Sequence, residues 1–184
     1  MHEFEYKFVE KYLNKDDVLL EWGSGNGTIY FSSLVKKLIS LEHDVDYFNQ
    51  IIKTIELFNI KNIEIYHISG VKVKNQKLER HIAFHDYINF PIVNNIKFDK
   101  VLIDGRARKY CAIALSEYID DETIVFIHDF NHDNVEGYED ENYFDDILNK
   151  YYIFDRVTDG RGIVALKKKK NGLDNNIHKL EKEE

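Results

Sequence analysis

The sequence predicts an α/β fold in which a mostly parallel β-sheet is covered by helices. Short apolar runs typical of strands alternate with longer segments whose apolar residues recur at helical spacing, and this alternation indicates βαβ units. A glycine-rich segment, Gly23–Gly27, follows the first strand-like run, and two strand-like runs close together end the regular part. The 184 residues suffice for one sizeable core. We expect a single domain over residues 1–167 and a charged, solvated tail over residues 168–184.

The first half of the chain supplies three predicted strands, each preceded by a helix. The opening segment is amphipathic, and in the longest helical segment the apolar residues follow the i, i+3, i+4, i+7 spacing of one helix face. The strands are short apolar runs between these segments. In chain order the predicted elements are helix Glu3–Leu13, strand Val18–Trp22, helix Thr28–Lys37, strand Leu38–Glu42, helix Val45–Phe58 and strand Ile63–Ile68.

The second half begins with an irregular, strongly polar segment, Ser69–Pro91, for which no element is predicted. Two more apolar runs separated by a helical pattern then continue the β–α alternation. A short helix and the two closing strands complete the domain. In chain order these elements are strand Phe98–Ile103, helix Ala107–Ile119, strand Thr123–Ile127, helix Tyr143–Lys150, and strands Tyr151–Phe154 and Gly162–Leu166.

Composition disfavours several classes of function. Asp and Glu outnumber Lys and Arg by 33 to 25, a net charge of −8, which disfavours a duplex nucleic acid partner. No segment approaches the roughly 20 apolar residues of a membrane span. The start, M-H-E-F-E-Y-K-F, lacks the basic and then apolar pattern of a signal peptide. The single cysteine, Cys111, fits a reducing compartment. We expect a cytoplasmic protein without a membrane span.

The segment Glu21–Gly27, E-W-G-S-G-N-G, lies where the first predicted strand ends. Ligands of open parallel sheets bind beyond this end of the strands, and glycines let a ligand lie against the backbone. A dinucleotide site favours G-x-G-x-x-G, whereas this chain has G-x-G-x-G with a carboxylate two residues before the first glycine. The spacing favours a ligand without a phosphate at this loop. A glycine-rich turn with only a folding role is the alternative.

A second acid, Glu42, ends the second predicted strand. Its separation from Glu21 fits the acid that holds the two hydroxyls of a nucleoside ribose. His43, the next residue, is expected to line the site. The alternative is that Glu42 only caps the following helix, with Asp44 as the N-cap residue proper.

The pattern E-x-G-x-G-x-G resembles the first motif of class I S-adenosylmethionine (SAM) methyltransferases. The resemblance implies a Rossmann-like three-layer αβα sandwich with a mostly parallel seven-stranded sheet whose last strand is antiparallel. It also implies SAM as cofactor, with Glu21 near the methionine ammonium, Glu42 on the ribose and Asp86 near the adenine; a turn aspartate is the alternative for Asp86. The residues expected to bind the cofactor are Glu21, Trp22, Gly23, Ser24, Gly25, Gly27, Thr28, Glu42, His43, Asp86, Tyr87 and Asp104.

Two further strand ends carry charged residues. Asp104 follows the fourth predicted strand, and His128 and Asp129 follow the fifth. Charged groups directly after buried runs are poor structural choices unless they are paired or functional, so these three are the candidate catalytic residues. In one interpretation, Asp104 or His128 is a general base that removes a hydroxyl proton from the methyl acceptor.

In a second interpretation, Asp104 and Asp129 hold Mg²⁺, with Asn131 or His132 as further ligands, and the ion acidifies the acceptor hydroxyl. A third possibility is a salt-bridge network of Asp129 with nearby arginines. The candidate acceptor-binding residues are Arg106, Arg108 and Tyr110, because guanidinium groups recognise carboxylates and hydroxyls.

The motifs V-L-I-D-G-R-A-R and F-I-H-D-F narrow the resemblance to one branch of SAM methyltransferases. This branch includes plant glucuronoxylan 4-O-methyltransferases and methyltransferase domains of viral and bacterial glycan-decorating proteins. The class-level resemblance covers about Asp17–Leu166, whereas Arg106–Arg108 departs from the plant pattern. The resemblance implies methyl transfer to a hydroxyl of a sugar or glycan.

Three other functions remain as alternatives. The first is an O-methyltransferase for another class of small molecule, and the second is a catalytically silent SAM-binding interaction module. The third, a nicotinamide-dependent dehydrogenase, is disfavoured by the glycine spacing. No N-P-P-Y-type motif follows the fourth strand, which disfavours methylation of amino groups on adenine or glutamine.

Overall fold

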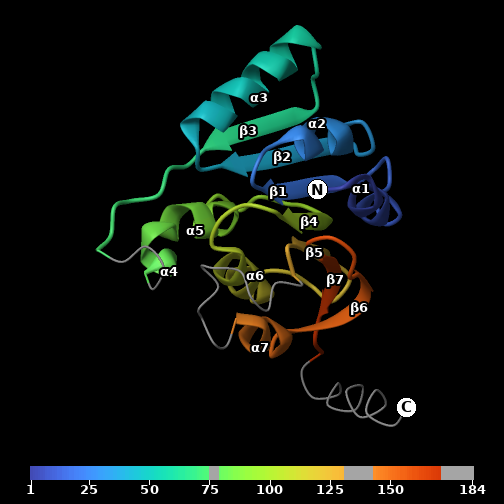
Figure 1. The fold of residues 1–184 in the computed structure, drawn as a ribbon, viewed down its shortest axis with the longest axis vertical. Helices are drawn as coiled ribbons and strands as arrows, with labels where there is room; N and C mark the ends of the chain where they lie inside the picture. The colour runs from blue at the N-terminus through green and yellow to red at the C-terminus, as the bar shows by residue number, and fades with distance from the viewer. Residues whose placement is uncertain (75–78, 131–142, 171–184) are drawn as a thin grey trace.

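Seven strands form one sheet in the computed structural model, which describes residues 1–74, 79–130 and 143–170. The strand order is β3-β2-β1-β4-β5-β7-β6 (Figure 1). All neighbouring pairs are parallel except those of β7, which runs antiparallel to β5 and to β6. The predicted sheet with an antiparallel last strand is therefore confirmed. The strands are β1 (Val18–Trp22), β2 (Lys37–Glu42), β3 (Ile63–His67), β4 (Lys100–Ile103), β5 (Ile124–His128), β6 (Tyr151–Val157) and β7 (Ile163–Lys168).

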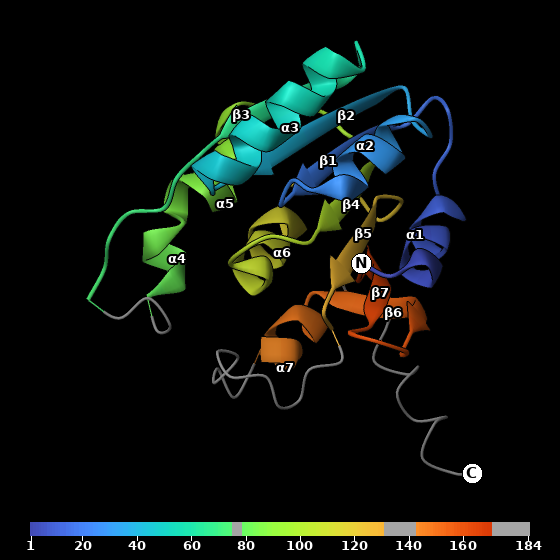
Figure 2. The same ribbon diagram turned by 45° about the horizontal axis from the view of Figure 1, so that its top comes forward.

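Helices cover both faces of this sheet, and the central strands are therefore apolar on both sides. Leu19 of β1 packs in one core with residues of α1 and α2, whereas Leu20 packs in the other core with residues of α5, α6 and α7. Figure 2 shows α3 along β2 and β3. The helices are α1 (Glu3–Glu10), α2 (Asn26–Ser32), α3 (Val45–Leu57), α4 (Arg80–Ala83), α5 (His85–Val93), α6 (Arg108–Ser116) and α7 (Tyr143–Leu148). None of the described helices is long and apolar enough to cross a bilayer.

Helix α4 and most of α5 lie in Ser69–Pro91, for which the sequence predicts no regular element, and that prediction is wrong. Pro91 lies inside α5. A proline has no N–H, so it leaves the carbonyl oxygen four residues earlier, at Tyr87, without its helical donor. The indole Nε1 of buried Trp22 donates to that oxygen at 2.9 Å. A tertiary hydrogen bond therefore compensates for the proline, and local sequence alone does not reveal it.

The strand register brings the predicted site residues to one edge of the sheet. Trp22, the last residue of β1, is aligned with Leu41 of β2 and with Ile103 of β4, and Ile103 is aligned with Ile127 of β5. The residues that follow these positions therefore emerge side by side. They are Gly23, Glu42, Asp104 and His128.

Candidate functional site

A cavity of about 510 Å³ lies at this edge of the sheet. It brings together most of the residues that the sequence predicts for a site. These are Glu21, Gly23, Ser24, Gly25, Gly27, Glu42, His43, Asp104, Arg106, Arg108, His128 and Asp129. The cavity also has lining residues that were not predicted: Met1, Tyr6, Asn26, Tyr47, Gly105 and Arg161.

The first and second glycines of the loop have different roles. Gly23 has a φ of +96°, and a Cβ there would lie 2.6 Å from the Cα of Gly105, so this glycine lets the loops after β1 and β4 touch. Gly25 is the N-cap residue of α2 and lines the cavity, and a Cβ there would meet nothing within 4 Å. Gly23 is therefore required for packing, whereas Gly25 leaves open space where a ligand can lie.

Glu21 lies at the bottom of the loop and is only 2% exposed. Its Oε2 accepts hydrogen bonds from the hydroxyls of Thr28 and Ser40, both at 2.7 Å. Burial raises the pKa of Glu21 to about 8, although both hydroxyls act to lower it. Ser40, which was not predicted, connects this acid to Ser24 through a 2.7 Å contact between the two hydroxyls.

Glu42 is equally buried but is held as an anion. Its carboxylate accepts hydrogen bonds from the backbone N–H groups of Ser24, His43 and Asp44 at 2.7–2.8 Å. Burial acts to raise the pKa of Glu42, but the His43 side chain and the backbone N–H groups of Asp44 and Ser24 outweigh burial and hold it below its usual value. Asp44 is the N-cap residue of α3. Glu42 therefore lines the cavity rather than serving as the cap of that helix.

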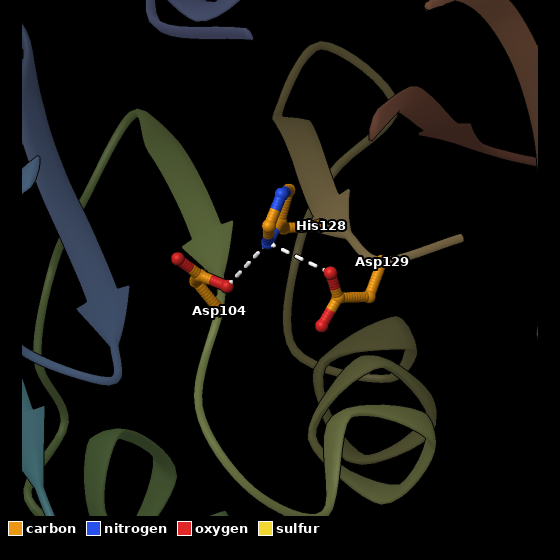
Figure 3. A group of neighbouring side chains, drawn as sticks. All are labelled: Asp104, His128 and Asp129. Atoms are coloured by element: carbon orange, nitrogen blue, oxygen red, sulfur yellow. Dashed lines mark hydrogen bonds and ion pairs between the residues drawn. The ribbon is translucent and has the colours of Figure 1, made fainter. Parts of the chain in front are cut away.

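Both ring nitrogens of His128 face carboxylates, and Figure 3 shows the two on the Nδ1 side, Asp104 and Asp129. Its Nδ1 is 2.7 Å from Oδ1 of Asp104 and 3.3 Å from Oδ1 of Asp129. Its Nε2 is 3.1 Å from Oε1 of Glu5, a fully buried residue of α1. Burial acts to lower the pKa of His128, but Asp104, Asp129 and Glu5 together raise it. This cluster, Glu5–Asp104–His128–Asp129, is called the carboxylate–histidine cluster below.

Glu5 is not among the predicted site residues, although its place in the sequence carries a signal. It lies on the buried face of α1 with Phe8 and Val9, at i+3 and i+4. An acid on the apolar face of a helix is costly to bury unless it has a partner. Its second oxygen, Oε2, accepts a hydrogen bond from the backbone N–H of His2 at 2.5 Å.

Asp129 has a positive φ of 58° and pairs with arginines. Its Oδ2 is 2.7 Å from Arg108 and 3.6 Å from Arg161. Burial acts to raise the pKa of Asp129, but Arg108 and His128 outweigh burial and lower it. Arg108 also donates to the carbonyl oxygens of Gly105 and His128, at 2.9 and 2.8 Å.

These contacts do not fit the Mg²⁺ site predicted at Asp104 and Asp129. The groups of Asp104, His128 and Asp129 lie within 4.8 Å of one another, as a metal site would require. However, the Oδ1 atoms of both aspartates face His128 Nδ1, and the other oxygen of Asp129 faces Arg108. Mg²⁺ prefers an octahedral set of oxygen ligands. Asn131 and His132, the further ligands considered, lie outside the described residues.

Five predicted site residues do not line the cavity: Trp22, Thr28, Asp86, Tyr87 and Tyr110. The structure does not bring Asp86 to the predicted adenine contact, because its side chain is 85% exposed and pairs with His85. Its position in the first turn of α5 faces solvent, since the opposite face, with Tyr87, Ile88 and Pro91, is buried.

The other residues outside the lining have structural contacts. The Thr28 hydroxyl donates a hydrogen bond to Glu21, and the Trp22 indole donates one to a backbone carbonyl oxygen of α5. The Tyr87 hydroxyl lies 2.2 Å from where a Cβ of Gly105 would be, so only glycine fits there. The Tyr110 ring packs against that of His81, with centroids 5.4 Å apart.

The sequence matches no model of a protein family and no curated protein. Solved structures do resemble its fold. A methyltransferase-like protein from Silicibacter pomeroyi is 18% identical with a TM-score of 0.64, and the match covers 91% of this chain and 87% of that one. An rRNA methylase from Streptococcus thermophilus is 10% identical with a TM-score of 0.59, covering 91% and 95%.

MtNAS, in complex with MTA and tNA, is 13% identical with a TM-score of 0.63, and the match covers 91% of this chain but 59% of that one. A variant of MtNAS was solved with S-adenosylmethionine, and a further similar structure, from Streptococcus mutans, with SAH. At these identities the comparisons show the fold alone. The chain has the Rossmann-like fold that these proteins share.

Proposed function

We propose that the protein is a SAM-dependent methyltransferase that methylates a hydroxyl oxygen, with Asp104 as the group that accepts the hydroxyl proton. One observation carries the proposal: a single cavity joins the glycine loop, Glu21 and Glu42 to Asp104 and His128. The ends of adjacent parallel strands are where nucleosides bind in such sheets. Similar folds solved with S-adenosylmethionine and SAH support this cofactor.

The residues of the cavity fit such a cofactor. The open space beside Gly25 leaves room against the backbone, and the ionised Glu42 can accept hydrogen bonds from two ribose hydroxyls. Glu21 offers a carboxyl to an ammonium group. When bound, the cofactor supplies an electrophilic methyl group on a sulfonium ion.

Methyl transfer breaks the sulfur–methyl bond and forms an oxygen–methyl bond, and the acceptor hydroxyl must lose its proton. Neither nitrogen of His128 is left for that proton, because both face carboxylates. Asp104 lines the cavity, and its Oδ2 has no hydrogen-bond partner in the described part of the chain. We therefore assign the proton to Asp104, with His128 as the residue that holds Asp104 in place.

For the acceptor we propose a hydroxyl group of a sugar or glycan. The D-G and H-D motifs, whose acidic residues belong to the carboxylate–histidine cluster, support this class through their resemblance to glycan methyltransferases. Arg106 and Arg161 line the cavity, and guanidinium groups bind hydroxyls and carboxylates well. The net charge of −8 disfavours a nucleic acid acceptor, although one similar fold is that of an rRNA methylase.

Calorimetry with SAM and SAH tests the first half of the proposal. The folded protein should bind both, and Gly25→Asp should abolish binding, because it adds bulk and negative charge to the open space beside the loop. Gly25 has an extended φ of −175°, so this variant should fold normally. A folded wild-type sample that binds neither compound contradicts the proposal.

An assay of methyl transfer to a panel of sugars and oligosaccharides, with the release of SAH as the measured quantity, tests the second half of the proposal. Asp104→Asn should lower the rate at least ~100-fold, as expected for the loss of a general base. Asp86→Asn is the matched control and should leave the rate unchanged, because Asp86 is exposed and outside the cavity lining. A metal chelator should not change the rate. Binding of SAM without transfer to any acceptor would instead favour an interaction module.

A further inference from the structure

Glu21 differs from the other acids that line the cavity in having hydroxyl donors but no cation. Its Oε2 accepts from Thr28 and Ser40, and within the described residues no ion pair involves it. Asp104 and Asp129, in contrast, face His128, and Glu42 faces His43 and several backbone N–H groups. A carboxylate that is 2% exposed and has no cation is costly to ionise.

The groups around Glu21 increase this cost. Two other carboxylates, Asp104 after β4 and Glu42 at the end of β2, act on it with like charge. The hydroxyls of Tyr6 in α1 and Tyr87 in α5 also interact electrostatically with Glu21. Both are neutral, and burial is the largest cause that raises their pKa values. The basic side chains of the same cavity are His43, Arg106, Arg108, His128 and Arg161. Of these, His43, Arg108, His128 and Arg161 are already close to other acids.

We propose that binding of a cofactor that carries an ammonium group drives the proton off the Glu21 carboxyl, so that cofactor binding is linked to proton release. This rests on the proposed SAM-binding function. In the free protein the Glu21 carboxyl is protonated; in the complex the ammonium of SAM or SAH supplies the cation that the carboxylate lacks. The O–H bond of the carboxyl breaks and its proton leaves to buffer, so net charge is conserved. Each SAH then binds with release of about one proton near pH 7.

The proton release depends on the ammonium group. 5′-Methylthioadenosine has the nucleoside of SAH but no amino acid part and therefore no ammonium. It should bind with Glu21 still protonated and without release of a proton. Raising the pH from 6 to 7 should tighten SAH binding about tenfold, because one proton leaves per complex, and should leave the affinity for 5′-methylthioadenosine unchanged.

Calorimetry at pH 7 in buffers of different ionisation enthalpy measures the protons released. The full chain is titrated with SAH and, separately, with 5′-methylthioadenosine. The expected result is close to one proton for SAH and none for 5′-methylthioadenosine. Glu21→Gln keeps an oxygen acceptor for Thr28 and Ser40 but has no proton to release, so any SAH that it binds should show no linked proton.

Two results would overturn the inference: SAH binding to the wild type without proton release, or the same release for SAH and 5′-methylthioadenosine. Release that persists in Glu21→Gln would also overturn it, because another group would then supply the proton. If Glu21→Gln fails to fold, the wild-type comparison of the two compounds still decides. Failure of the folded wild type to bind SAH at all would count against the proposed function, and is a separate outcome.

Discussion

His128 illustrates how neighbours set the role of a single side chain. On sequence alone it is a candidate base, because its ordinary pKa lies near neutrality. In the fold, Asp104 and Glu5 face its two nitrogens at 2.7 and 3.1 Å. A ring whose two nitrogens both point at carboxylates donates on both sides. His128 is therefore suited to orienting Asp104.

Replacement of Glu5 tests this arrangement. Glu5→Ala should lower the free energy of unfolding by about 3 kcal/mol, because it removes one partner of a buried ion pair. Glu5→Gln should cost less, since its amide oxygen can still accept from His128. Denaturation in urea measures both changes. Glu3→Ala, on the exposed face of the same helix, is the control. A loss for Glu5→Ala no larger than for Glu3→Ala would contradict the structural role given to Glu5.

Most of the predicted site residues that line the cavity stand at a strand end or in the loop that follows it. Glu42, Asp104 and His128 do so, and the register of a parallel sheet brings such positions together. Glu5 and Ser40 do not follow this rule. Glu5 reaches the site because α1 packs against β5, and Ser40 is a buried hydroxyl inside β2. Their roles depend on packing between distant segments, which periodicity does not report.

At the scale of elements, α5 and the glycine loop depend on each other. Pro91 leaves the Tyr87 carbonyl oxygen without its helical donor, and Trp22, directly before the loop, donates to it. The Tyr87 hydroxyl in turn packs against Gly105, and Gly105 against Gly23. Helix α5 thus supports the loops after β1 and β4, although the two of its residues that were predicted to bind the cofactor, Asp86 and Tyr87, do not line the cavity.

A double-mutant cycle tests the link between Trp22 and Pro91. Trp22→Phe leaves the buried carbonyl oxygen of Tyr87 without a donor. In the Pro91→Ala background, the restored backbone N–H at position 91 can donate to that oxygen instead. Trp22→Phe should therefore destabilise the wild type by about 1–3 kcal/mol more than it destabilises Pro91→Ala. Thermal or chemical unfolding measures all four proteins. Equal costs in both backgrounds would show that the hydrogen bond contributes little.

The strands were more predictable than the helices, for a physical reason. A strand buried on both faces is a continuous apolar run, which is visible in the sequence. Helix α2 was predicted to reach Lys37 but ends at Ser32, because the chain must turn before β2 begins at Lys37. Strand β6 continues to Val157, beyond the predicted Phe154, through pairing with β7. The ends of elements depend on such pairing. Helix α5 contains Pro91, a residue that locally argues against a helix.

For the whole molecule, burial of Glu21 links stability to pH. Its pKa is about 8 in the folded protein against 4.5 for the free side chain. Between these values the folded state holds a proton that the unfolded state has lost, so this residue makes stability fall as pH rises. Below about pH 4.5 the carboxyl is protonated in both states and costs nothing.

Comparison with Glu21→Gln isolates this contribution. From pH 5 to pH 8 the free wild type should lose stability relative to Glu21→Gln by on the order of 3 kcal/mol. Thermal unfolding of both proteins across this range, without cofactor, measures the difference. Saturating SAH should reduce the loss in the wild type, because the ammonium then compensates the ionised carboxylate. A constant difference between the two proteins would mean that Glu21 is ionised throughout.

The contact between Glu5 and His128 joins residues 123 positions apart in the chain. Glu21 and Ser40, in contrast, are separated by only 19 positions. Closing a longer loop costs more chain entropy, so contacts at large sequence separation form later. The half of the site that is proposed to bind the nucleoside should consequently assemble early during folding, around β1 and β2. The half that is proposed to accept the proton must wait until β5 is in the sheet and α1 has packed on it. On the proposed function, the chain should therefore gain cofactor affinity before it gains activity.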